Sequence, residues 1–408
     1  MTTIEGNIVS QKGIKRGFIE IGDDGLISSV GLPIGQADIV LKEELIFPGF
    51  IDLHVHAREC TDHSWDYKED FASASNASIN GGVVAFADMP NNPTPPIDDR
   101  SYAEKLNLTK KSPVEILLYA GTNPTSNPLQ AKVPYKVYIS KSVGDLFFDS
   151  FTELENFAKK YQGQNVSFHC EDPDILRAKV NETAHELKRP ESAEVSAVEM
   201  ALKMIEKYNL QGKICHASTK EGIEKIKQAR SRGVKVSVEV TPHHLFFDQT
   251  MFEPDKKGIF QVNPPIRQSP ETREYMLQAL KNGEIDFIAT DHAPHSPEEK
   301  AKGTSGLTHL DTFAPFTTWL MRDCGFTPQD ILRVCAENPA QFFNQFSVHQ
   351  YGEIRKGFVG SLTIIDMNKP ITIEKSMLKT KANWSPFEGM TFPGSVAMTV
   401  IKGKVFKN

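Results

Sequence analysis

Between residues 48 and 295, short apolar segments recur eight times, and helical stretches lie between most of them. Near-continuous apolar strands are typical of a parallel sheet that is buried on both faces. Eight β-then-α units predict an α/β fold, a (β/α)8 TIM-like barrel. A doubly wound sheet is the alternative, but no glycine-rich nucleotide loop follows the first segment. The segments are residues 49–56, 83–89, 114–120, 135–139, 166–170, 213–218, 235–240 and 286–292.

The two ends of the chain differ from this central pattern. Residues 1–47 contain GFIEIGDDGLISSVG, which reads as two short strands around an Asp-Asp-Gly turn. Residues 347–408 contain GSLTIIDM and SVAMTVIKGKVF, which are also strand-like. We therefore expect residues 1–47 and 347–408 to form one small β-sandwich beside a barrel domain of residues 48–346.

The composition narrows the range of partners and compartments. The chain of 408 residues has a formal net charge of −6 and no basic tract, which argues against nucleic acid or an anionic membrane as the main partner. No apolar run approaches the ~20 residues of a membrane span, and the N-terminus lacks a signal-peptide core. Five scattered cysteines without a CxxC pair indicate a reducing compartment. We expect a cytoplasmic protein that acts on a small molecule.

Titratable side chains gather where the apolar segments end, which is where a barrel carries its active site. His54 and His56 point to one face of the first strand, because a strand alternates its faces. An isolated pair of this kind also fits ordinary core or surface histidines, so the functional interpretation depends on further ligands. Other strand ends supply His169, His216 and Asp291, the last followed by His292 and His295.

Four imidazoles and one carboxylate exceed the needs of a single catalytic zinc, which takes three protein ligands and keeps a water site. Two metals about 3.5–4 Å apart fit this set better, and they need a bridging anion such as hydroxide. Lys136 lies inside the fourth apolar segment. It either snorkels out of an edge strand or, when neutral, adds carbon dioxide to give a carbamate that could bridge both ions.

Eight motifs lie between about residues 46 and 303: DLHVHARE, ADMPNN, YKVYIS, SFHCED, CHASTKE, EVTPHHLFF, VNPPIR and ATDHAPHSPEEK. Together they resemble the motifs of the dihydroorotases, within the cyclic amidohydrolases. The resemblance implies a zinc-dependent barrel enzyme that reversibly cyclises N-carbamoyl-L-aspartate to (S)-dihydroorotate in pyrimidine (UMP) biosynthesis. It further implies a homodimer and association with other pyrimidine-pathway enzymes.

The same resemblance implies a set of metal ligands and a catalytic residue. One zinc would be held by His54, His56 and Asp291, and the other by His169 and His216, with a carbamate on Lys136 between them. Asp291 would also accept the proton of a bridging hydroxide that attacks the ring amide, and pass it to the leaving nitrogen.

A third zinc is a further expectation. Cys215 precedes His216, and Glu239 ends the seventh apolar segment. The two resemble a pair found in animal-type dihydroorotases, and His169 could reach both. The alternative is a buried cysteine and a glutamate that is bonded to nearby backbone.

Arg58 is expected to bind the substrate carboxylate, because its planar guanidinium can donate two parallel hydrogen bonds to a carboxylate. The resemblance adds four substrate contacts, of which the asparagines also fit turn or cap positions beside proline. The family often has REPG where this chain has RECT, residues 58–61. The four contacts are Asn91, Asn263, His295 and Gly303.

Two other functions remain open. A hydantoinase, dihydropyrimidinase or allantoinase shares the metal ligands but generally lacks an arginine after the H-x-H pair, so Arg58 discriminates. A non-catalytic barrel that is retained as an assembly partner is expected to have lost a ligand or Asp291, and neither is missing.

Overall fold

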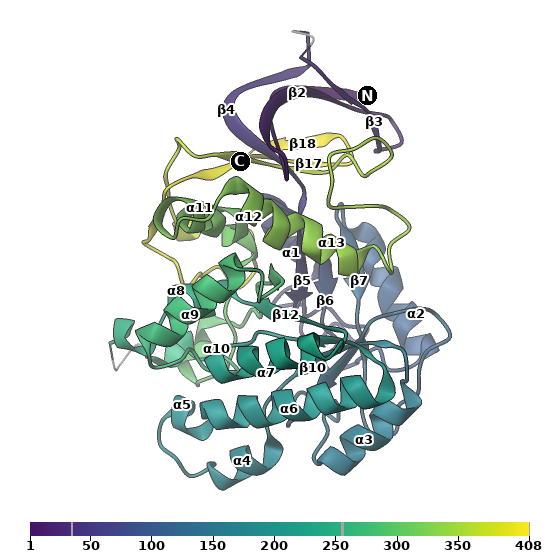
Figure 1. Ribbon diagram of the computed structural model, residues 1–408, viewed down its shortest axis with the longest axis vertical. Coiled ribbons are helices and arrows are strands. Elements are labelled where there is room, and N and C mark those ends of the chain that lie inside the picture. The colour runs from purple at the N-terminus through teal and green to yellow at the C-terminus, as the bar shows by residue number, and fades with distance from the viewer. Residues whose placement is uncertain (34–35, 254–256, 408) are drawn as a thin grey trace.

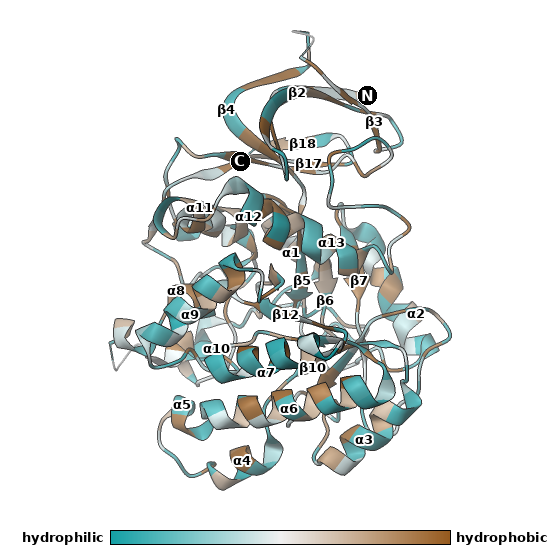
Figure 2. Cartoon of the chain, in the orientation of Figure 1, coloured by the Kyte–Doolittle hydropathy of each residue, from teal (hydrophilic) through white to brown (hydrophobic). Residues whose placement is uncertain are grey.

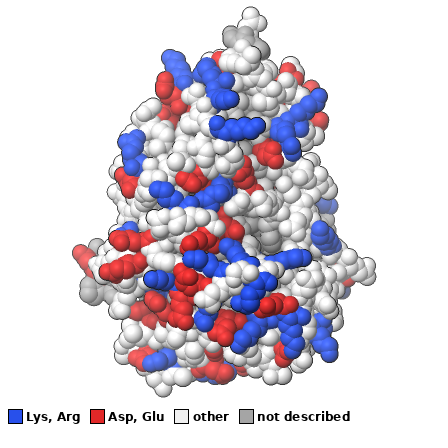
Figure 3. Space-filling model, viewed as in Figure 1, with Lys and Arg blue, Asp and Glu red and all other residues white. Residues whose placement is uncertain are grey.

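The computed structural model describes residues 1–33, 36–253 and 257–407. A region of parallel strands and helices lies below a curved sheet in the view of Figure 1, and both chain ends belong to that sheet. None of the helices in these ranges combines the length and the apolar character that a membrane crossing requires. Lysine, arginine and acidic residues are intermixed on the face shown in Figure 3.

All eight apolar segments contain strands that pair in parallel with their neighbours. β5, β6 and β7 form one sheet, and β8 to β13 form a second in sequential order. β5 and β6 are buried along their whole length, as expected for strands covered on both faces. The strands are β5 (Phe50–Val55), β6 (Val83–Asp88), β7 (Glu115–Leu118), β8 (Ala120–Gly121), β9 (Tyr135–Tyr138), β10 (Asn165–His169), β11 (Gln211–Ile214), β12 (Val236–Val240) and β13 (Phe287–Ile288).

Two connections join these sheets into a ring. Only Tyr119 separates β7 from β8, so the third predicted segment contributes to both sheets. On the other side, an isolated parallel bridge joins Val55 to His292, and the backbone N–H of His56 donates to the carbonyl of His292 at 2.7 Å. The end of the last predicted segment therefore lies beside the first strand, as in a (β/α)8 barrel.

Helices follow most of the strands, and the longer ones carry both hydrophilic and hydrophobic residues along their length (Figure 2). In α6, for example, Ala197, Ala201 and Ile205 are buried at i, i+4 spacing. The helices are α1 (Phe71–Asn80), α2 (Asp99–Leu108), α3 (Phe151–Lys160), α4 (Pro173–Ala178), α5 (His185–Lys188), α6 (Glu191–Tyr208), α7 (Lys220–Ser231), α8 (Pro242–Phe246), α9 (Pro270–Lys281), α10 (Pro297–Ala301), α11 (Phe313–Asp323), α12 (Pro328–Leu332) and α13 (Asn338–Phe343). The short 3-10 helices are η1 (Thr109–Lys111), η2 (Gln249–Met251), η3 (Lys257–Phe260), η4 (Leu310–Thr312) and η6 (Lys375–Met377), and η5 (Arg333–Glu337) is a π-helix.

The two chain ends build a seven-stranded sheet in the order β18-β17-β14-β4-β1-β2-β3. β4 pairs in parallel with β1 and antiparallel with β14, so one continuous ladder connects the ends. The predicted sandwich is not confirmed, because these described strands form a single sheet. Its strands are β1 (Thr2–Ser10), β2 (Gly13–Ile21), β3 (Ile27–Gly31), β4 (Ile39–Pro48), β14 (Leu362–Asp366), β17 (Ser395–Ile401) and β18 (Lys404–Lys407); β15 (Ile371–Thr372) pairs with β16 (Thr391–Phe392).

Thr363, on β14, anchors the terminal sheet to the first barrel strands. Its buried hydroxyl donates to the carbonyl of Gly82 at 2.6 Å and accepts from the backbone N–H of Phe50 at 2.9 Å. The N–H of Gly49 donates to the carbonyl of Ser361 at 2.9 Å. These contacts hold the sheet against the ends of β5 and β6 that are remote from the histidines.

Candidate active site

A cavity of about 380 Å³ lies at the carboxyl ends of the barrel strands. Lys136, Cys215 and Glu239 are buried in the barrel and do not line it. Gly303 also lies outside the lining, whereas residues 304–306 contribute to it. The predicted residues that line it are His54, His56, Arg58, Asn91, His169, His216, Asn263, Asp291 and His295.

The first group of converging side chains combines residues from the beginning and from the end of the barrel part of the sequence. His56 Nε2 lies 3.0 Å from Asp291 Oδ1, and His54 Nε2 lies 3.3 Å from the same oxygen. Asn91 Oδ1 lies 2.7 Å from His56 Nδ1. The amide oxygen therefore accepts from a protonated Nδ1 and leaves the lone pair of Nε2 directed at the carboxylate.

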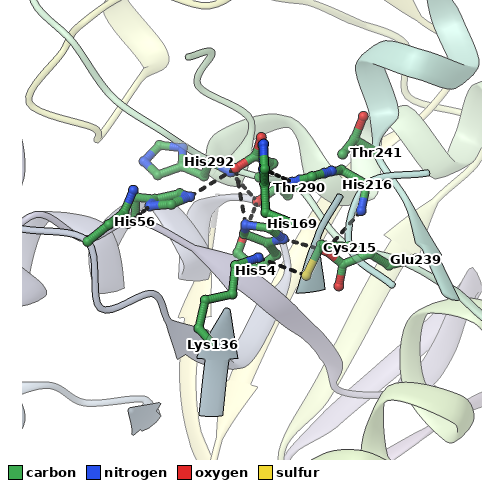
Figure 4. Close-up of polar contacts among 12 residues, drawn as sticks. His54, His56, Lys136, His169, Cys215, His216, Glu239, Thr241, Thr290 and His292 are labelled. Carbon is green, nitrogen blue, oxygen red and sulfur yellow. Dashed lines mark hydrogen bonds and ion pairs between the residues drawn. The ribbon is translucent and has the colours of Figure 1, made fainter. Parts of the chain in front are cut away.

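The second group combines the ends of β10 and β11. His169 Nδ1 lies 2.9 Å from His216 Nε2, and His169 Nε2 lies 2.8 Å from Glu171 Oε2. Arg189 forms an ion pair with the same carboxylate. Figure 4 shows the imidazoles of both groups gathered above Lys136. The residues that lie far apart in the sequence thus meet at one end of the barrel, as the strand-end pattern predicts.

Lys136, Cys215 and Glu239 lie at the base of this cluster. Lys136 Nζ donates to Cys215 Sγ at 2.8 Å, and Lys213 Nζ lies 2.5 Å from Glu239 Oε2. Glu239 also contacts His54 Nδ1.

The imidazole beside Cys215 and Glu239 is that of His54, and the three possible ligand atoms lie within 4.8 Å of one another. The expectation that His169 reaches Cys215 and Glu239 is not met, because its two nitrogens face His216 and Glu171.

Burial sets the protonation of these groups. It holds the pKa values of His54, His56 and His216 well below the usual range, and neighbouring cations act in the same direction. Burial also raises the pKa of Asp291 to about 7, against the opposing effect of Lys136. The imidazoles of His54, His56 and His216 are therefore neutral near pH 7, which is the form that binds metal.

The donor set fits divalent metal ions. Neutral imidazole nitrogen and carboxylate oxygen are common zinc ligands, and two nitrogens converge on Asp291 Oδ1 while two others converge on each other. Cys215 differs, since burial raises its thiol pKa to about 11, and a metal must displace its proton.

The other end of the cavity is cationic. Arg58 is 5% exposed, and its Nη2 lies 3.0 Å from His295 Nε2 while its Nε donates to the carbonyl of Pro294 at 3.3 Å. Its backbone φ of 63° lies in the left-handed region, which is uncommon for a non-glycine residue. The RECT segment thus turns sharply after the histidine pair and places the guanidinium against the cavity.

Several lining residues were not predicted from the sequence. Tyr138 lies two positions after Lys136 on the same strand, so the strand period was an available signal. Its buried hydroxyl has no hydrogen-bond partner among the described residues. Other lining residues come from loops, where no periodicity indicates their direction. They include Trp65, Lys68, Lys141, Ser142, Val143 and Arg189.

Residues 45–406 match the model of the amidohydrolase family. A dihydroorotase of Pyrococcus furiosus is 32% identical over 406 residues, which cover 98% of this chain and 91% of the relative. A dihydroorotase of Pyrococcus horikoshii is 34% identical over 409 residues, with the same coverage.

Among solved structures, an L-hydantoinase (dihydropyrimidinase) from Arthrobacter aurescens superposes with a TM-score of 0.89 at 24% identity, covering 100% of this chain and 96% of the other. That likeness shows the barrel fold. The relatives found by sequence also show to which group within the family the chain is most similar. The chain therefore belongs to the amidohydrolase family, and within that family it groups with the dihydroorotases.

Proposed function

We propose that this enzyme is a dihydroorotase, which interconverts (S)-dihydroorotate and N-carbamoyl-L-aspartate. The dihydroorotases among its relatives support this activity over nearly the whole chain. The observation that carries the substrate choice is Arg58, a buried cation at one end of the cavity that also holds the histidine cluster. A neutral ring would leave that guanidinium without an ion-pair partner among the described residues, whereas the dihydroorotate carboxylate pairs with it.

In this proposal, two zinc ions occupy the histidine cluster. His54, His56 and Asp291 would hold one, His169 and His216 would hold the other, and a carbamate formed by carbon dioxide on Lys136 would be a further ligand. Bound zinc supplies Lewis-acid chemistry, which activates water and polarises a carbonyl. A third zinc would lie between His54, Cys215 and Glu239, whose ligand atoms are close enough for one ion.

The chain's own residues orient the substrate and move its protons. Arg58 and His295 bind the carboxylate, with Asn91 and Asn263 at the cavity wall. During ring opening, a C–O bond forms at the ring carbonyl and the adjacent C–N bond breaks. Asp291 accepts the proton that water loses and donates it to the leaving nitrogen, a role that suits a carboxyl pKa of about 7.

The test is ring opening by the purified, zinc-loaded protein. Dihydroorotate should be hydrolysed with a kcat/KM at least about tenfold above that for hydantoin or allantoin, since one charge-assisted contact contributes about 1.5–3 kcal/mol. Preference for either neutral ring would favour the hydantoinase alternative. The absence of turnover on all three would favour a non-catalytic role. A homodimer, association with other pyrimidine-pathway enzymes and a cytoplasmic location stay predictions.

A further inference from the structure

The two ring nitrogens of His295 have different surroundings. Nε2 lies 3.0 Å from Nη2 of Arg58. A guanidinium nitrogen can only donate a hydrogen bond, so Nε2 must be the acceptor and carry no proton. The neutral ring therefore has its proton on Nδ1, from which it can donate to Oε2 of Glu299 at 3.3 Å.

Nδ1 also faces a donor. Lys68 Nζ lies 3.4 Å from it and 2.8 Å from Glu299 Oε1, so an ion pair of a lysine and a glutamate borders this nitrogen. Nδ1 can therefore donate to Glu299 or accept from Lys68. Either neutral form of the imidazole finds a partner without movement of the surrounding chain.

The ion pair is held in place from both sides. Lys68 is 5% exposed, and its ammonium lies 4.1 Å from the centre of the Trp65 ring. The hydroxyl of Tyr67 donates to Glu299 Oε1 at 2.8 Å, and the backbone N–H of Ser296 donates to Oε2 at 3.0 Å. The loop after β5 and the start of α10 thus fix Lys68 and Glu299 at His295.

A substrate carboxylate changes what His295 must do. A carboxylate only accepts hydrogen bonds, so His295 can bind it only with a proton on Nε2. Protonation of both nitrogens is opposed by burial and by the positive charges of Arg58 and Lys68, which hold the pKa of His295 below its usual range while Glu299 acts the other way. A neutral ring whose proton changes position avoids that penalty.

We propose that Lys68 and Glu299 are positioning residues that let His295 exchange its tautomer when the substrate carboxylate binds. In the empty site, Nδ1–H donates to Glu299 and Nε2 accepts from Arg58. In the occupied site, Nε2–H donates to the carboxylate, Lys68 donates to Nδ1, and Arg58 turns to the carboxylate. One proton leaves Nδ1 and one arrives at Nε2, so the ring stays neutral. This inference rests on the proposed function and names residues that serve its substrate recognition.

Nitrogen-15 NMR of the zinc-loaded protein, labelled at histidine, tests the exchange directly. The probe is orotate, the unsaturated analogue of dihydroorotate, and the His295→Asn variant identifies the signals of His295. We expect a neutral Nδ1–H ring without orotate and a neutral Nε2–H ring with it. The same tautomer in both states, or an imidazolium in the complex, would overturn the proposal.

Steady-state kinetics separate positioning from a general structural role. Lys68→Met should raise KM for dihydroorotate roughly 5- to 100-fold, as for a lost buried hydrogen bond, and should change kcat far less. Turnover of dihydrouracil, which lacks the carboxylate, should not change. Equal losses on both rings would mean that Lys68 only supports the loop.

Glu299 offers a matched pair of variants. Glu299→Ala should raise KM for dihydroorotate, and Glu299→Gln should restore much of the loss, because an amide oxygen can still accept from Nδ1–H. The control is Glu298→Ala at the exposed neighbouring position, which should match the unmodified protein. Equal effects of the two alanine variants would contradict a role at His295.

The outcomes also separate this inference from the function on which it rests. If the unmodified enzyme neither turns over dihydroorotate nor binds orotate, both fall together. If it turns over dihydroorotate while His295 keeps one tautomer, only the exchange is wrong.

Discussion

The active end of the barrel and the terminal sheet differ in backbone conformation and in the burial of strained residues. At the active end, Arg58, His216 and Asp291 are buried with φ values of 63°, 35° and 49°, a left-handed backbone that costs on the order of 1–3 kcal/mol per residue. In the terminal sheet, the left-handed Lys402 is exposed and lies in the turn between β17 and β18. β1 and β2 pair without interruption over their whole length.

The difference shows where the tertiary structure overrides the local conformational preference of the backbone. In the sheet, the buried isoleucines at positions 4, 19, 46 and 364 belong to a core that is separate from the barrel core. At the active end, buried charges and a strained backbone persist because the surrounding barrel holds them. Substitutions at the active end should therefore alter chemistry, and those in the sheet should alter stability.

The largest effect is expected at Lys136. Lys136→Ala removes the proposed carbamate, so zinc content should fall and kcat/KM for dihydroorotate should drop at least about 1000-fold, since metal catalysis contributes several kcal/mol. Short-chain carboxylic acids should restore part of both. Metal analysis and kinetics with and without these acids provide the measurement. Full metal loading and activity in the bare alanine variant would show that the carbamate is not needed.

Arg58→Met should have the next largest effect. A charge-assisted contact in a dry pocket contributes on the order of 2–4 kcal/mol, which corresponds to a loss of roughly 30- to 1000-fold in kcat/KM for dihydroorotate. Zinc content should stay unchanged, and the loss on dihydrouracil should be smaller. A proportional loss on both rings would mean that Arg58 supports the loop or the metals.

Thr363→Val tests the other side of the comparison. The variant removes both hydrogen bonds between Thr363 and the barrel, so it should lower the free energy of unfolding by about 1–3 kcal/mol. The kcat/KM of the folded enzyme should stay the same. Denaturant unfolding and kinetics measure the two quantities, with Thr372→Val on the exposed strand β15 as the control. Reduced turnover at unchanged stability would break the division between the regions.

The smallest effect on the fold is expected at Cys215. If a third zinc lies between His54, Cys215 and Glu239, metal analysis should find three zinc ions per chain and two in Cys215→Ser. The barrel should stay folded, because serine keeps a similar volume. Two zinc ions per chain in both proteins would show that the third site does not exist.

Periodicity predicts the barrel strands because burial on both faces leaves a continuous apolar run. It fails at the last strand, where β13 covers only Phe287–Ile288 within the predicted segment 286–292. The chain then adopts a left-handed conformation at Asp291 and bends toward His56. Apolar character alone does not encode that bend.

The candidate site was likewise predictable from the sequence only in part. The strand period places His54 and His56 on one face, and strand ends locate His169, His216 and Asp291. Contacts across the barrel have no such signal: the sequence does not indicate that His54, rather than His169, lies beside Cys215 and Glu239. The Lys68–Glu299 pair joins a loop to a helix start far along the chain, so only the folded structure brings it into view.

The pairing of β4 with β14 has a consequence for the order of events during synthesis. β4 ends at Pro48, and its partner begins at Leu362. Roughly 300 residues separate them, so a ribosome working at about 5–20 residues per second needs roughly 15–60 seconds to deliver the partner. Throughout that interval, one edge of β4 has no strand to complete it, and such an edge can pair with another chain. The barrel segments emerge after β4 and before β14, so the sheet that anchors them closes last.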